Sequence, residues 1–185
     1  GIDISTDSFG SDNLEDLISH SKKVVDATKD IALAYKPNFA FFEKWGSKGF
    51  EWLEEMMGYI GDGPITIADA KRGDIGNTAK QYAASIFGHF DFDSVTLSPY
   101  MGEDSIMPFL KIEEKGVFML CRTSNPSAKT FQSLNFNNEI KLYEQVAKWA
   151  DSLNDNDNVG LVVGATAPEE LIKVRRLAPS LPILI

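Results

Sequence analysis

The stretch that decides the fold is residues 65–78, ITIADAKRGDIGNT, in which a short apolar strand runs directly into two acids and two bases. Because side chains alternate faces along an extended chain, Asp69 and Lys71 should project from the same side of the strand end, with Asp74 following in the loop. Buried charges are costly unless they are paired. This charged cluster therefore either lies open to water as a surface turn or lines a polar site.

Outward from this stretch, short apolar runs alternate with segments that have helical periodicity. The predicted strands are residues 1–4, 30–35, the run that begins at residue 65, 94–97, 117–121, 160–163 and 182–185. The predicted helices are residues 12–29, 41–57 in two pieces, 78–88, 104–114, 138–153 and 168–178. Ser11 or Asp12 is expected to cap the first of these helices.

Apolar strands alternating with helices predict an α/β fold with a parallel sheet, either doubly wound or a (β/α)8 barrel. The barrel is favoured because polar residues recur where successive strands end, which is where a barrel collects its active site. These residues are Asp3, Lys36, Asp69, Lys71, Ser98, Thr123 and Ser124. A length of 185 residues fits a single domain over 1–185. Since the chain starts at Gly1 and stops inside the seventh strand, we expect sequence to be missing at both ends, with the barrel truncated after strand seven.

Composition and charge exclude several classes of partner. The chain has 18 basic and 27 acidic residues, a formal charge of −9, which disfavours nucleic acids and anionic membranes but leaves room for a small anionic substrate in a locally basic cleft. No apolar run is long enough for a membrane helix, and no signal peptide is recognised. The single cysteine, Cys121, lies in an apolar run and is expected to be a buried, inert thiol. These features predict a cytoplasmic protein.

Common site motifs are absent from the sequence. It contains no Gly-rich dinucleotide loop, Walker loop or nucleophile elbow. The two histidines, His20 and His89, fall in predicted helices, where a surface or packing role is favoured over catalysis. No His-rich or Cys-rich spacing indicates a transition-metal site, so we expect none.

The segment Asp69-Ala-Lys71-Arg-Gly-Asp74-Ile75-Gly-Asn-Thr78 resembles the signature of the orotidine 5′-monophosphate decarboxylases, Asp-x-Lys-x-x-Asp followed by Ile-Gly-x-Thr. Three further segments are similar to the bacterial and protozoan branch of that family, so the resemblance extends over nearly the whole chain. They are Gly1-Ile-Asp3 at the end of the first strand, Lys36-Pro-Asn38 after the second, and Thr123-Ser124-Asn-Pro126 in the loop that contacts the pyrimidine.

The resemblance implies decarboxylation of orotidine 5′-phosphate to uridine 5′-phosphate in pyrimidine biosynthesis, without a cofactor. It assigns catalysis to Lys36, Asp69, Lys71 and Asp74, with Lys71 stabilising and protonating the carbanion. Asp3, Asn38, Ile75, Thr78, Thr123 and Ser124 are implied to bind substrate. Asp74, Ile75 and Thr78 match residues that the family contributes across a homodimer interface, which implies active sites shared between two chains.

Two alternatives stay open. The Asp-x-Lys-x-x-Asp triplet is shared with magnesium-dependent sugar-phosphate decarboxylases and aldolases of the same barrel superfamily, but those relatives carry a metal-binding acid where this chain has Lys36. A non-catalytic barrel whose charges form a salt-bridge network is the second alternative. The family's phosphate-binding loop, Gln and Arg follow strands seven and eight, so they are expected beyond Ile185.

Overall fold

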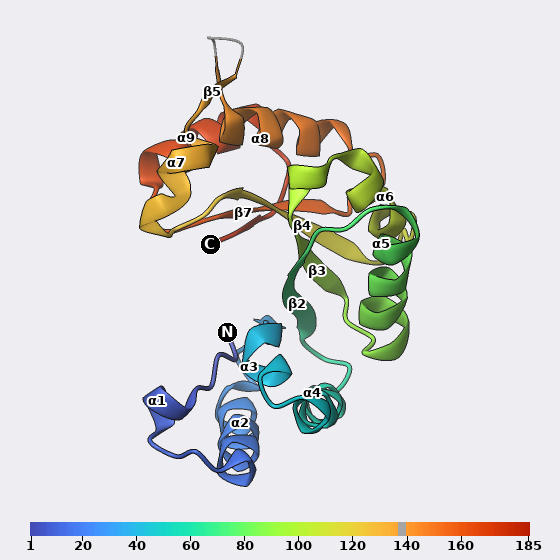
Figure 1. Cartoon of the computed structure of the whole chain (residues 1–185), viewed down its shortest axis with the longest axis vertical. Coiled ribbons are helices and arrows are strands. Elements are labelled where there is room, and N and C mark those ends of the chain that lie inside the picture. The colour runs from blue at the N-terminus through green and yellow to red at the C-terminus, as the bar shows by residue number, and fades with distance from the viewer. Residues whose placement is uncertain (137–139) are drawn as a thin grey trace. The chain divides into compact units, whose positions relative to one another are not determined.

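The computed structural model describes residues 1–136 and 140–185 and has an α/β fold (Figure 1). The elements of the first half are α1 Thr6–Phe9, α2 Leu14–Thr28, β1 Ala34–Tyr35, α3 Phe39–Glu43, α4 Ser47–Ile60, β2 Ile65–Arg72, α5 Gly76–Ala83 and a π-helical turn Ala84–His89. The second half contains β3 Ser94–Leu97, a 3-10 turn Pro99–Met101, α6 Glu103–Leu110, β4 Gly116–Arg122, a 3-10 turn Pro126–Ala128, α7 Lys129–Gln132, β5 Asn135–Phe136, β6 Ile140–Lys141, α8 Leu142–Ser152, β7 Val159–Val163, α9 Pro168–Leu177 and β8 Ile183–Leu184.

The main sheet of the described chain has six strands in the order β1-β2-β3-β4-β7-β8. The pairs β1 with β2, β4 with β7, and β7 with β8 are parallel. Helices separate most of these strands along the chain, as parallel pairing requires. The predicted α/β class with a parallel sheet is therefore confirmed. The strands β5 and β6 form a separate antiparallel pair.

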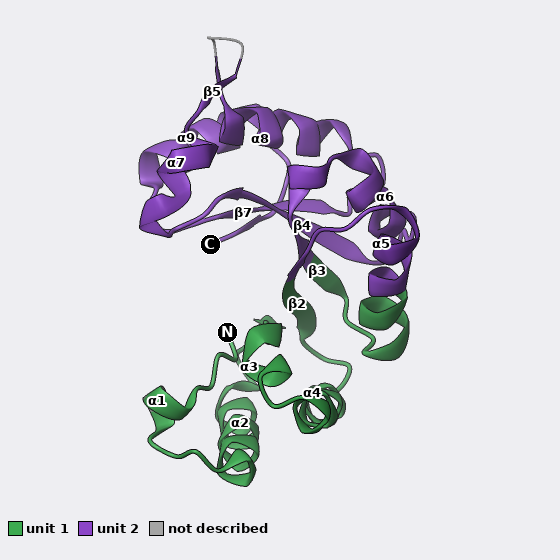
Figure 2. Cartoon of the chain, in the orientation of Figure 1, with its two compact units in different colours: residues 1–70, 84–95 green, residues 71–83, 96–185 purple. Residues whose placement is uncertain are grey.

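Contacts divide the chain into two compact units, residues 1–70 with 84–95 and residues 71–83 with 96–185 (Figure 2). Both β2 and β3 contribute residues to each unit. The single domain over 1–185 stays a prediction.

In the first unit, α2 packs against α4. The side chain of Asn13 accepts a hydrogen bond from the Glu15 N–H and so caps α2, a role expected of Ser11 or Asp12. Trp52 of α4 is buried and donates its indole N–H to the buried hydroxyl of Ser21 on α2, 3.1 Å away. The buried polar groups of Ser21 and Trp52 thus satisfy each other within the packing between the two helices.

In the second unit, α8 and α9 pack against each other, and α8 also packs against β4 and β7. Every second side chain of β4 is buried up to Cys121, as expected for a strand with one covered face. Pro168 opens α9 at the predicted position, where its missing N–H costs nothing.

Three predicted elements differ from the structure. Residues 1–4 contribute only an isolated parallel bridge between Ile2 and Pro37. The strand expected over 30–35 is reduced to β1, because the N–H groups of Ile31 and Ala32 still bond to the Thr28 carbonyl at the end of α2. The helix expected over 138–153 is α8 from residue 142, and positions 138 and 139 lie outside the described residues.

Among the described residues, no helix combines the length and apolar character that crossing a membrane requires.

Candidate active site

The first unit brings Lys36 and Asp69 together. Lys36 follows β1 and Asp69 lies within β2, and the ammonium of Lys36 is 2.9 Å from Oδ2 of Asp69. Asp69 is only 8% exposed, and its backbone N–H donates to the Pro37 carbonyl at 3.0 Å. A nearly buried carboxylate needs such a partner to offset lost hydration. The strands β1 and β2, which bring these two residues together, pair in parallel.

The segments that contain Asp3 and Asn38 adjoin this pair. The Ile2 N–H donates to the Lys36 carbonyl at 3.0 Å, which places the exposed Asp3 next to the segment that follows β1. Asn38 forms a parallel bridge with Asp69. Its Oδ1 accepts from the Ala40 N–H and caps α3, so the amide is already oriented by the helix it begins.

Lys71 has an unusual backbone. Its φ is 45°, in the left-handed region that non-glycine residues rarely adopt. Its N–H donates to the hydroxyl of the buried Thr96 at 3.0 Å, and one residue later the Arg72 carbonyl accepts from the Ser98 N–H at 2.7 Å. Two contacts from the segment containing β3 thus hold the exposed Lys71 in a conformation that costs free energy, a feature that clusters at functional sites.

Asp74, Ile75 and Thr78 gather at the start of α5. Asp74 Oδ1 accepts from the Ile75 N–H at 2.8 Å, and the Ile75 carbonyl accepts from the Thr78 N–H. Ile75 is 48% exposed, and Thr78 is exposed as well. A single exposed apolar side chain is common on protein surfaces, so the exposure of Ile75 alone assigns it no role.

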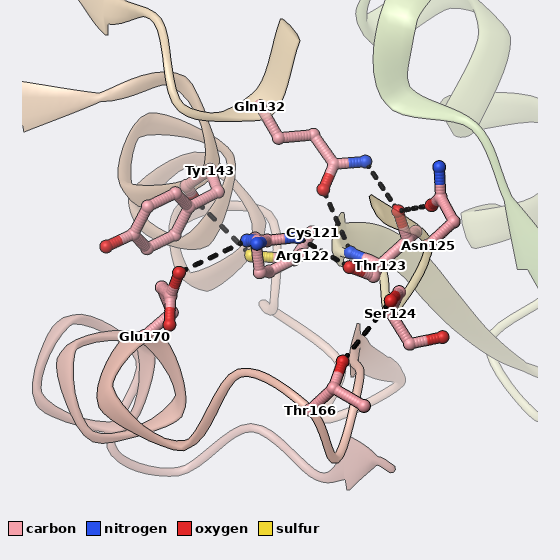
Figure 3. A network of polar contacts seen from close by, with 9 residues as sticks. All are labelled: Cys121, Arg122, Thr123, Ser124, Asn125, Gln132, Tyr143, Thr166 and Glu170. Atoms are coloured by element: carbon pink, nitrogen blue, oxygen red, sulfur yellow. Dashed lines mark hydrogen bonds and ion pairs between the residues drawn. The ribbon is translucent and has the colours of Figure 1, made fainter. Parts of the chain in front are cut away.

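Thr123 and Ser124 follow β4 and belong to a polar network in the second unit (Figure 3). Thr123 is bonded to Gln132, Asn125 and Arg122, whereas Ser124 is exposed and its carbonyl accepts from the Thr166 hydroxyl at 3.3 Å. The sequence predicted Thr123 and Ser124 as site residues but missed Gln132, Arg122 and Glu170. The one signal that the sequence offers is an arginine directly after the apolar run 117–121.

Gly164 allows the end of β7 to approach Ser124 closely. Its N–H donates to the Arg122 carbonyl at 2.7 Å, and a Cβ at this position would lie 2.7 Å from both the nitrogen and the Cβ of Ser124. Because backbone atoms are among the obstacles, the clash cannot be relieved by rotating a side chain.

Gly164→Ala should therefore lower the free energy of unfolding by about 1–3 kcal/mol and shift the amide resonance of Ser124, since overpacking a tight site displaces the backbone. Chemical denaturation and NMR would measure the two effects. Gly58→Ala is the matched control, because a Cβ at Gly58 in α4 meets nothing within 4 Å. Equal stability of the two variants would contradict the close approach.

Cys121 and the histidines behave as the sequence predicted. Cys121 is buried, and burial raises the pKa of its thiol to about 12, so it is no nucleophile near neutral pH. His20 stacks on Phe9 with ring centroids 4.4 Å apart, and the exposed His89 contacts Glu54 at 2.7 Å. Among residues 1–136 and 140–185, no three His, Cys, Asp or Glu side chains form a group that could hold a metal ion.

Parallel strands alternating with helices define the α/β class to which (β/α)8 barrel proteins belong, and the strand ends are where such barrels place their active sites. Comparison with known proteins agrees. Residues 3–184 match the family described as Orotidine 5′-phosphate decarboxylase / HUMPS family. The chain belongs to this family.

Individual relatives give the same result. The chain is 51% identical over 166 residues to the orotidine 5′-phosphate decarboxylase of Halorubrum lacusprofundi, covering 89% of the chain and 58% of that protein. It is 47% identical to the enzyme of the same name from Dehalococcoides mccartyi, covering 91% of the chain and 63% of the relative. The solved structure of Leishmania donovani OMP decarboxylase superposes with a TM-score of 0.93 at 42% identity, covering 99% of the chain and 71% of that structure. The chain thus spans about three fifths of the length of these two curated relatives.

Proposed function

We propose that this protein decarboxylates orotidine 5′-phosphate to uridine 5′-phosphate, without a metal or an organic cofactor. The observation that carries the proposal is the ammonium of Lys36, 2.9 Å from Oδ2 of the nearly buried Asp69. A divalent cation bound at Asp69 would have to displace this ammonium or lie beside a like charge, which is unfavourable. Both metal-free and magnesium-dependent enzymes carry the Asp-x-Lys-x-x-Asp triplet. Lys36 therefore favours the metal-free reaction.

The reaction breaks the bond between C6 of the pyrimidine and its carboxylate. Carbon dioxide leaves, and the electron pair stays on C6 in an sp2 orbital orthogonal to the ring π system, where resonance cannot spread it. Opposite unit charges about 4 Å apart attract by roughly 4 kcal/mol at an effective dielectric near 20. Lys71 supplies that positive charge, then donates its proton to C6 and recovers a proton from water.

The neighbouring residues support this step. Asp69 lies near the departing carboxylate, where it either repels that group or holds Lys71 in place. Lys36 bridges the acids and, with Asp3 and Asn38, meets the ribose hydroxyls. Thr123 and Ser124 form the loop that approaches the base.

We further propose that the protein works as a homodimer with shared sites. Asp74, Ile75 and Thr78 reach the site of the partner chain, which accounts for an exposed Ile75 beside a half-buried Asp74 at the start of α5. The single buried thiol of Cys121 favours a reducing compartment, and so a cytoplasmic location.

A magnesium-dependent decarboxylase or aldolase acting on a sugar phosphate is the enzymatic alternative, and a barrel without catalytic activity is the other. The loss of orotidine 5′-phosphate absorbance in the presence of excess EDTA tests the proposed reaction against both. Undiminished turnover under EDTA is the expected result. Decarboxylation that disappears with the chelator and returns with Mg²⁺ would contradict the metal-free mechanism, and no loss of orotidine 5′-phosphate under either condition would reject the proposed reaction in favour of one of the two alternatives.

A further inference from the structure

All the polar groups of Thr123 are engaged inside the protein (Figure 3). Its N–H donates to Oε1 of Gln132 at 2.9 Å, and Nε2 of the same amide donates to its hydroxyl at 2.8 Å. Because that amide nitrogen is only a donor, the Thr123 hydroxyl must use its own hydrogen elsewhere, and it points to Oδ1 of Asn125 at 2.6 Å. The Thr123 carbonyl accepts from a guanidinium nitrogen of Arg122 at 2.5 Å.

The strand β4 is irregular just before Arg122. Leu120 pairs with Val162 and Arg122 with Val163, so Cys121 is an extra residue in the ladder. Such a bulge changes the direction of the side chains that follow it. Cys121 and Arg122 are consequently both buried, although they are consecutive.

The buried guanidinium of Arg122 has a charged partner. Its Nε lies 3.5 Å from a carboxylate oxygen of Glu170 on α9, and its side chain is 6% exposed. Since a buried cation is costly unless it is paired and hydrogen-bonded, the carboxylate of Glu170 and the Thr123 carbonyl together fix the orientation of the arginine. The arginine in turn fixes the carbonyl of Thr123.

Ser124, the next residue, differs from Thr123 in this respect. Its carbonyl accepts from Thr166, but its N–H and hydroxyl make no hydrogen bond to any residue in the described ranges. The side chain is exposed and points away from Arg122 and Gln132 (Figure 3). The N–H and hydroxyl of Ser124 are therefore available to another molecule, whereas the polar groups of Thr123 form hydrogen bonds that hold the loop in place.

We propose that Gln132 and Arg122 are positioning residues, which hold Thr123 so that Ser124 presents its N–H and hydroxyl to the pyrimidine ring. This inference rests on the proposed function and deepens it, because it moves Thr123 from the substrate-binding residues to their support. Gln132 lies on α7, nine residues after Thr123. Its side-chain amide forms two hydrogen bonds to Thr123 and so connects the two ends of the loop.

The test replaces Gln132 by methionine, which keeps the length and removes both hydrogen bonds. Gln145→Met is the matched control, because Gln145 of α8 is also half-buried, lines the same cavity of about 390 Å³ and makes no hydrogen bond to Thr123. Gln132→Glu keeps an acceptor for the Thr123 N–H and serves as the conservative rescue.

We expect Gln132→Met to raise KM for orotidine 5′-phosphate about tenfold or more with a smaller change in kcat, since two hydrogen bonds that orient a binding loop are lost. The exchange rate of the Thr123 amide, followed by NMR, should rise by a similar factor. Gln145→Met should change neither quantity, and Gln132→Glu should recover most of the amide protection and part of the KM.

If the wild-type protein is active and the variants Gln132→Met and Gln145→Met have the same KM, this inference is wrong but the proposed function stands. A Thr123 amide that exchanges equally fast in both variants would also overturn this inference. Inactive wild-type protein would instead reject the proposed function, and this inference with it.

Discussion

Replacing Lys71 by alanine should abolish decarboxylation while weakening substrate binding far less. The ammonium is most useful as negative charge develops on C6, so its loss raises the barrier more than it raises the dissociation constant. The backbone supports this role, because φ of 45° at Lys71 is maintained by hydrogen bonds of Lys71 and Arg72 to Thr96 and Ser98. Because its backbone is held in this way, the Cα–Cβ bond of Lys71 has a fixed direction. A fixed direction helps to place the ammonium before the reaction begins.

The measurement is single-turnover decarboxylation together with calorimetric titration of uridine 5′-phosphate. Lys111→Ala is the matched control, since Lys111 is an exposed lysine of the same unit at the end of α6. If Lys71→Ala kept more than about a tenth of the wild-type rate, equivalent to roughly 1.4 kcal/mol of barrier, Lys71 could not be the proton donor.

The strand ends of the first unit could be predicted because they depend on a few neighbouring residues in the sequence. An apolar run that stops at a polar residue indicates where a buried strand meets solvent, and parallel neighbours bring such ends to the same edge. On this ground Lys36 and Asp69 are predicted where two successive strands end, and an ion pair of 2.9 Å joins them in the structure.

Local reasoning failed where the backbone departs from regular geometry. The apolar letters of residues 30–35 predicted a buried strand, yet Ile31 and Leu33 are 84% and 81% exposed because a helical turn persists after α2. Alternation along β2 placed Asp69 and Lys71 on one side, but a positive φ at Lys71 ends the extended geometry there. That the side chains of Asp69 and Lys71 project from the same side of the strand stays a prediction.

The contacts of Arg122 and Gln132 that hold the Thr123 loop could not be predicted from the sequence either. Period-two alternation places Cys121 and Arg122 on opposite faces, and only the bulge at Cys121 buries both. Gln132 meets Thr123 through the folding of a loop with short 3-10 and α-helical turns, which no hydrophobic period describes. Contacts of this kind depend on tertiary structure, so single-sequence patterns cannot specify them.

Mixing two inactive variants should restore activity if the sites are shared between chains. Lys71→Ala disables the lysine that a chain provides to its own site, whereas Asp74→Asn disables the aspartate it provides to its partner. The half-buried Asp74 accepts from the Ile75 N–H at the start of α5, a bond that asparagine Oδ1 can still accept, so the second variant should fold normally.

In a mixture of equal amounts, half of the dimers carry one chain of each kind if subunits exchange freely. By the two-fold symmetry of such a dimer, one of its sites then contains both lesions and the other contains neither, so about a quarter of all sites should be intact. Co-refolding the two variants and measuring turnover tests this, with each variant refolded alone as the control and mass spectrometry confirming exchange. Because a site within one chain could never be repaired by mixing, background activity in a confirmed heterodimer would show that Asp74 serves its own chain.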